Sequence, residues 1–284
     1  MFEAPLPSEI DAAAPKPGGL ARVDGGVSIR IKARGGGSAI ADLLERDGYK
    51  VRFPRGTAHP EAVIINTGGG LAGGDRVRQT VIVDGGAAAT VTTQAAERVY
   101  RALDESETSL DVRLTVGGGA RLDWLPQETI LFDRSRLARS IDVEMAGDAR
   151  LLLAETIIFG RTAMGETVKT GRLIDRWRIR RGGRLVFAET VRLEGAIAET
   201  LDRPPVAGGA HVVATALAIR PDAEDLLEPV RAALTGAACE AGASAWNGML
   251  VIRALGRSGE SVRRLLERAL PVLSAAALPR VWQT

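Results

Sequence analysis

The glycine-rich segment in the first third of the chain has the residue spacing that most invites a chemical interpretation. An apolar run, Ala62–Ile65, leads into Gly68-x-Gly70-x-x-Gly73, the spacing with which glycines seat a pyrophosphate at the start of a helix. That chemistry needs a helix after the last glycine. Residues Arg76–Val83 instead alternate and end in a β-branched run, which predicts a strand. We therefore interpret the segment as a bent β-connection and keep a dinucleotide-binding enzyme as the alternative.

Several acidic residues lie in otherwise apolar segments. They are Asp75, Asp123, Glu128, Asp133, Glu155, Glu166 and Glu189. Acids in or near a core are costly unless they are paired, hydrogen-bonded or in contact with internal water. One interpretation pairs them with arginines such as Arg76, Arg121 and Arg161. The other is a hydrated interior path lined by oxygen ligands, which would pass a divalent cation without trapping it.

Residue types that commonly carry catalysis are scarce. The chain has two histidines, His59 and His211, and one cysteine, Cys239, so a cage of nitrogen and sulfur ligands would need carboxylates to complete it. Its sequence contains no Gly-x-Ser-x-Gly, HExxH or phosphate-loop motif. We therefore predict no catalytic residues and no tightly bound cofactor.

Composition narrows the class further. The 284 residues carry 37 basic and 35 acidic side chains, a net charge of +2, which does not favour a general binder of nucleic acid or of membrane surfaces. One cysteine cannot form an internal disulfide, the N-terminal residues lack a signal-peptide pattern, and no apolar run is long enough to span a membrane. These features predict a cytoplasmic protein. Aromatic residues make up only 4% of the chain, which argues against a β-solenoid that binds a polymer through exposed aromatics.

The predicted fold is mainly β, with coiled, solenoid-like stacked sheets and two C-terminal α-helices. A glycine turn followed by a short apolar strand recurs about every thirty residues, near residues 85, 118, 147 and 182. The strands between these turns alternate polar and apolar residues. Helical spacing appears after Pro221 and again after Ser258, until Pro271 kinks or ends the second helix. We expect a mobile arm over residues 1–20 and a single domain over 21–284, whose α/β part begins at about residue 211.

Six blocks, in order along the chain, resemble the urease accessory protein UreD family, called UreH in some organisms. They are Asn66–Arg76, Thr92–Arg101, Leu122–Asp133, Gly160–Glu166, Trp246–Arg253 and Leu278–Trp282. The resemblance extends from about residue 38 to the end.

The resemblance implies a non-enzymatic maturation factor. Such a protein assembles with UreF and the GTPase UreG on the structural subunits of apo-urease and helps nickel reach the active site, with a dimer formed through the accessory complex as one arrangement. Nickel would then be a transient cargo. Because a transit path needs weak, exchangeable ligands, we take Asp75, Glu155 and Glu189 as candidates for lining it.

Partner contact is expected at the C-terminal helices and tail. The candidate contact residues are Arg263, Arg264, Glu267, Arg280 and Trp282. Trp282 either anchors a helical partner or packs onto the body of the protein.

Overall fold

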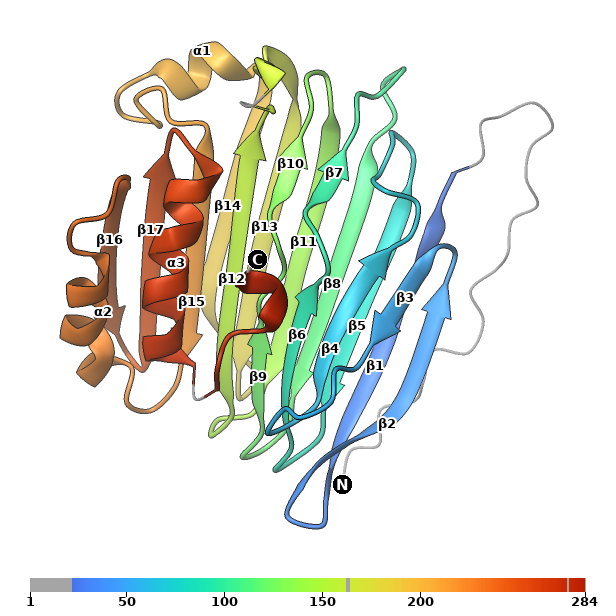
Figure 1. Cartoon of the computed structure of the whole chain (residues 1–284), viewed down its shortest axis with the longest axis vertical. Helices are drawn as coiled ribbons and strands as arrows, with labels where there is room; N and C mark the ends of the chain where they lie inside the picture. Colours follow the sequence, from blue (N-terminus) through green and yellow to red (C-terminus); the bar gives the residue numbers. More distant parts are fainter. Residues whose placement is uncertain (1–21, 162–163, 275, 284) are drawn as a thin grey trace.

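The computed structural model describes residues 22–161, 164–274 and 276–283. Strands of this described part form two sheets that pack face to face (Figure 1). The seven-stranded sheet contains β1 (Asp24–Arg34), β2 (Gly37–Arg46), β5 (Arg76–Val83), β8 (Thr108–Val116), β11 (Arg136–Met145), β13 (Thr170–Arg181) and β14 (Arg184–Ala196).

The second, ten-stranded sheet carries the C-terminal part of the chain. It contains β3 (Tyr49–Arg52), β4 (Glu61–Asn66), β6 (Ala88–Thr93), β7 (Glu97–Val99), β9 (Arg121–Trp124), β10 (Thr129–Leu131), β12 (Arg150–Phe159), β15 (Val212–Ile219), β16 (Glu240–Trp246) and β17 (Met249–Gly256). Helical segments are α1 (Ile197–Asp202), α2 (Leu227–Leu234), α3 (Gly259–Leu273) and the short 3-10 turns η2 (Glu224–Leu226) and η3 (Arg280–Trp282).

The middle of the chain is a coil that crosses between the sheets at the first three of the four glycine turns. β5, β8, β11 and β13 pair in parallel in one sheet, while β4, β6, β9 and β12 pair in parallel in the other. This arrangement confirms the predicted mainly β, solenoid-like class with C-terminal helices.

The fourth glycine turn behaves differently from the first three. Gly182 and Gly183 have φ values of 57° and 77°, so a two-residue loop with both residues in the left-handed region joins β13 to β14 as a hairpin. The chain therefore stays in the seven-stranded sheet at this point, and β14 becomes its edge strand. Pro271 does not end α3, which continues to Leu273.

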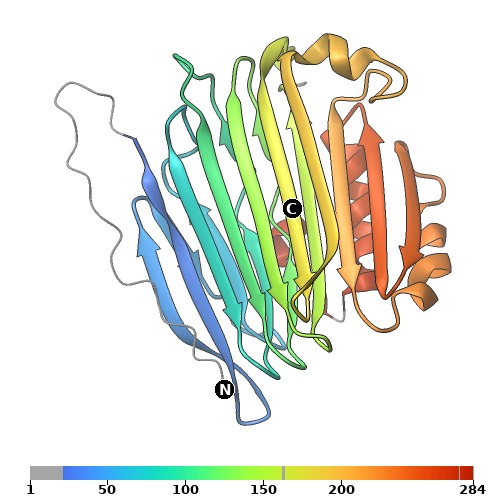
Figure 2. The same ribbon diagram turned by 180° about the vertical axis from the view of Figure 1, so that it is seen from behind.

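Apolar side chains fill two layers. The larger core lies between the two sheets and includes Ile29, Leu114 and Ile141. A smaller one lies between the ten-stranded sheet and α2, α3 and the C-terminal tail. The opposite face of the seven-stranded sheet is covered by no other described helix or strand (Figure 2).

The glycine segment does not form a nucleotide-binding turn. The strand β5, not a helix, begins at Arg76, directly after Gly74 and Asp75. A pyrophosphate bound in this way requires the backbone N–H groups of a helix start. The dinucleotide-binding alternative is therefore wrong for this segment. The predicted arm, residues 1–20, lies outside the described residues.

Candidate functional site: a charged cavity between the sheets

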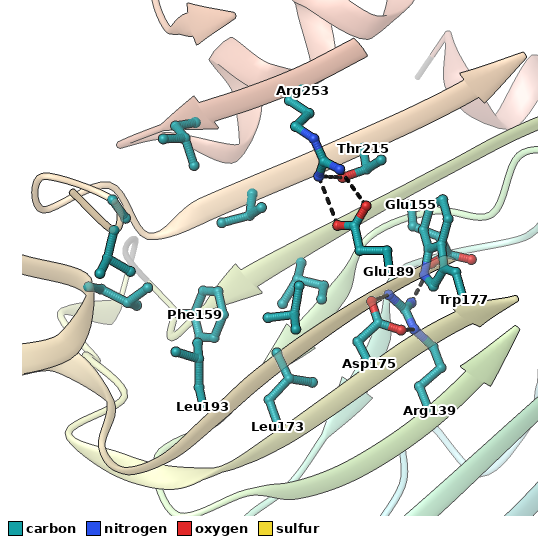
Figure 3. A pocket seen from close by; sticks show the side chains of 17 residues that line it. Arg139, Glu155, Phe159, Leu173, Asp175, Trp177, Glu189, Leu193, Thr215 and Arg253 are labelled. Carbon is teal, nitrogen blue, oxygen red and sulfur yellow. Dashed lines mark hydrogen bonds and ion pairs between the residues drawn. The ribbon is translucent and has the colours of Figure 1, made fainter. Parts of the chain in front are cut away.

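A cavity of about 200 Å³ lies between the two sheets near one edge of the molecule (Figure 3). Strands β11, β13 and β14 form one wall, and β12, β15 and β17 form the other. Apolar side chains such as Phe159 and Leu193 line most of it, but five of its residues are charged: Arg139, Glu155, Asp175, Glu189 and Arg253. A space of this size with several polar groups can hold water molecules.

Arg139 is the centre of a buried ionic network. Its side chain, on β11, is 1% exposed. The Nε and one terminal nitrogen donate to the two oxygens of Asp175 on β13, at 2.9 and 2.7 Å. The other terminal nitrogen donates to Glu155 on β12 and, at 3.4 Å, to Thr129. The second Glu155 oxygen accepts from the Trp124 indole N–H at 2.9 Å. The network therefore joins the two sheets through one guanidinium.

The pKa shifts follow from this burial. Burial alone would lower the pKa of Arg139, but Asp175 and Glu155 together raise it, so the guanidinium stays charged. Burial raises the pKa of Glu155, and the Arg139 charge opposes that shift. Two carboxylates share this one guanidinium.

A second ion pair lies at the side of the cavity. Arg253 on β17 donates to both oxygens of Glu189 on β14, one of them at 2.8 Å, and approaches the Thr215 hydroxyl at 3.5 Å. The Arg253 side chain is 56% exposed and that of Glu189 17%. This pair also links the two sheets, but water reaches it.

Two of the three predicted path residues thus line one cavity, and the third lies elsewhere. Asp75 is buried just before β5 and is not part of the cavity wall. Its carboxylate accepts the backbone N–H of Val23 at 2.9 Å and that of Ala72 at 2.7 Å. These bonds fasten the glycine segment to the start of β1.

A smaller cavity of about 190 Å³ adjoins the charged one. Both are lined by Phe159 and Leu201, which separate them. The second cavity also contains Glu166, Asp202 and His211, and the His211 Nε2 is buried without a hydrogen-bond partner among the described residues. Glu166, however, pairs with Arg161 at 2.6 Å. The polar lining therefore extends from the charged cavity into the adjoining one.

Arginine pairing explains most of the other acids that the sequence singled out. Asp123 lies 3.4 Å from Arg121, and Glu128 lies 3.1 Å from Arg263. Asp133 accepts two backbone N–H groups and lies 3.9 Å from Arg134. Within the described ranges, no group of three or more His, Cys, Asp or Glu residues has the geometry to hold a metal ion.

The predicted partner residues differ in exposure. Trp282 is buried and donates its indole N–H to the Leu125 carbonyl at 2.9 Å, so it packs onto the body of the protein. Arg263 stacks over its ring, with 5.3 Å from the guanidinium carbon to the ring centroid, and donates to the Val281 carbonyl. Of the two alternatives that the sequence left open for Trp282, these contacts show packing onto the body, so it is not an exposed anchor. Arg264 and Arg280 are exposed, and Glu267 is half-buried beside Arg263. Their contact with a partner stays a prediction.

Sequence reasoning missed Arg139, Asp175 and Arg253. A usable signal was present for the first two. In β11 and β13 the inward positions alternate strictly, and Arg139 and Asp175 occupy apolar positions in that alternation. A charged residue at a buried strand position needs a partner, and here the two positions are directly paired in register. Arg253 carries no comparable signal, because its partner lies in the other sheet.

The fold and the cavity together define a class: a coiled two-sheet β protein with a helical C-terminal layer and an arginine–carboxylate cavity. No helix among the described residues is long and apolar enough to cross a membrane. Residues 23–283 match the family described as UreD urease accessory protein.

Similar curated proteins agree with this family match. "Urease accessory protein UreD 1" of Methylobacterium radiotolerans is 46% identical across 100% of this chain and 99% of its own length. "Urease accessory protein UreD" of Xanthobacter autotrophicus is 47% identical across 93% of this chain and 91% of its own. The protein of the same name from Rhodopseudomonas palustris is 46% identical, with 92% and 93% covered. The chain therefore belongs to the UreD urease accessory protein family and has a role in urease maturation.

Proposed function

We propose that this protein is a non-enzymatic scaffold that assembles with UreF and UreG on apo-urease and assists nickel insertion. Family membership along residues 23–283 carries the proposal. The partners and the metal follow from the sequence resemblance given above. A cytoplasmic location stays a prediction on the same footing.

We also propose that the charged cavity lies on the route of the metal. Glu155 and Glu189 supply hard oxygen ligands, and each is already held by an arginine. A cation passing such a site competes with a guanidinium, so it binds weakly and leaves readily. The adjoining cavity with Glu166, Asp202 and His211 supports a continuation of the route. Asp75, which fastens a loop, has no such support and keeps only its sequence-based prediction.

Deletion of the gene tests the maturation role. Urease activity and the amount of urease structural subunits are measured in the same extracts. The proposal expects normal subunit levels, lost activity, low nickel in purified urease, and recovery when this chain is returned. Unchanged activity in a strain shown to hold no second copy of the gene would refute it.

A further inference from the structure

One edge of the sandwich is left open. The ten-stranded sheet extends past the edge strand β14, so none of the described strands lies opposite β16 and part of β17 (Figure 2). The four residues of β16 that face the seven-stranded side, Glu240, Gly242, Ser244 and Trp246, are all exposed. At the opposite edge the sheets end together, and the Glu45 carboxylate of β2 accepts the Val51 N–H of β3 at 2.7 Å. The two edges of the molecule therefore differ.

A notch lies at the open edge. Its wall is the polar backbone edge of β14, and its floor is formed by β16, which has small residues. We use "notch" for the space bounded by the free side of β14 and by the inward face of β16. β14 pairs only with β13 among the described strands, so its other side offers unpaired N–H and C=O groups. Apolar side chains surround the notch: Leu185 is 51% exposed, Trp246 41% and Val206 40%. Unpaired backbone beside exposed apolar groups is the arrangement that an added strand satisfies.

From this arrangement we propose that an extended segment of a partner protein adds to β14 as an eighth strand and covers β16. Neighbouring strands lie about 4.8 Å apart, and β16 lies one strand beyond β17, so the notch has room for one added strand. β16 has 7 residues, which sets the length of the segment.

A second copy of this chain does not fit the notch. Two copies of β14 would pair antiparallel about a twofold axis perpendicular to the sheet. Both ten-stranded sheets would then lie on the same side, and their protruding β16 strands would occupy the same space. Parallel pairing of identical strands does not close a dimer. The added strand must therefore come from a segment that carries no second sheet packed against it.

The side chains around the notch specify the chemistry of that segment. Gly242 and Ser244 leave space on the floor for large apolar side chains, next to Trp246. Arg184 and Arg192 of β14 are exposed, and Arg192 pairs with Glu194 of the same strand at 3.0 Å. Arg253 exposes its guanidinium although it pairs with Glu189. Glu240 is the opposing charge on the floor. These features fit a strand with apolar residues inward and acidic residues outward. The inference does not depend on the proposed role in urease maturation.

Three synthetic octapeptides test the proposal with the full chain: alternating Val-Glu, alternating Val-Lys, and the Val-Glu peptide with two valines replaced by proline. Fluorescence anisotropy measures affinity, and hydrogen exchange read by mass spectrometry locates protection. We expect the Val-Glu peptide to bind about tenfold more tightly than the Val-Lys peptide. It should protect residues 184–196, and the proline peptide should do neither.

Matched variants sharpen the test. Leu185→Glu should weaken the Val-Glu peptide about tenfold. Leu44→Glu, at a residue 54% exposed on the other edge strand β2, should leave its affinity unchanged. Equal affinity for the two charged peptides, protection that leaves residues 184–196 unprotected, or no binding would overturn the proposal. So would protection of residues 184–196 that appears with rising protein concentration alone, which would make a second copy the occupant.

Discussion

Two ion pairs line the same cavity and link the same two sheets, yet their surroundings differ. The Arg139 network is buried, and each terminal nitrogen of the guanidinium is engaged by a carboxylate. The Glu189–Arg253 pair lies at the cavity side, with more than half of the arginine side chain in water. Breaking a buried pair leaves an uncompensated charge in a low-dielectric interior, whereas an exposed pair is replaced by hydration. The Arg139 network therefore holds the two sheets together, whereas the Glu189–Arg253 pair is free to exchange partners.

The largest effect should follow from loss of the central cation. Arg139→Ala leaves Glu155 and Asp175 buried beside each other, so we expect the free energy of unfolding to fall by about 3–5 kcal/mol. Urea denaturation followed by circular dichroism measures it. A loss below about 1 kcal/mol would show that the network does not hold the sheets together.

Substitution of one carboxylate in the same network should cost less. Glu155→Gln keeps an oxygen acceptor for the Trp124 N–H and leaves Arg139 paired with Asp175. We expect a change within about 1 kcal/mol, against about 2–3 kcal/mol for Glu155→Ala, which leaves two buried donors unpaired. Thermal melts of the two variants side by side provide the comparison. Equal losses would mean that packing, not hydrogen bonding, sets the effect.

The pH dependence of stability tests the environment of Glu155. Because its folded pKa is raised above the ordinary value, 4.5, the folded state holds a proton that the unfolded chain has released. Stability from this group is therefore present below pH 4.5 and is lost as pH rises through the raised pKa. Relative to Glu155→Gln, wild type should gain stability as pH falls through this window. A difference independent of pH would contradict the shift.

The smallest effect on folding should come from the exposed pair. Arg253→Ala is expected to lower the free energy of unfolding by less than about 1 kcal/mol, and a cycle with Glu189→Ala should give a coupling of similar size. High salt should reduce that coupling, since water surrounds the guanidinium. A coupling of several kcal/mol would show that the exposed pair stabilises the fold as much as the buried network does.

Local patterns predicted the fold class well, because each pattern depends only on residues within one strand, helix or turn. Alternation identified β8, β11 and β13, and three- and four-residue spacing identified α2 and α3. Long-range outcomes were harder. The hairpin at Gly182-Gly183 differs from the earlier crossings in its shorter loop and in having both turn residues at positive φ. Trp282 is buried because the tail folds back over β9 to reach Leu125, a contact between residues far apart in the sequence.

The candidate site was predictable in part for the same reason. Glu155 and Glu189 were identified as acids in apolar strands, but their meeting in one cavity depends on which strands face each other. Asp75 satisfies the same sequence criterion and lies outside that cavity. Its partners are backbone N–H groups, and hydrogen bonds to the backbone cannot be predicted from residue types.

The most direct test of the account compares two glutamates in a strain that lacks the chromosomal gene. Returning the chain with Glu189→Gln changes the exchangeable pair at the cavity, whereas Glu144→Gln changes an exposed ion pair with Arg180 on the outer sheet face. The measurement is the nickel content and activity of purified urease, with the level of each variant determined in the same extracts. We predict that Glu189→Gln lowers both severalfold at an unchanged variant level, while Glu144→Gln supports wild-type values. Wild-type nickel content with Glu189→Gln would contradict the role of this cavity in metal transfer.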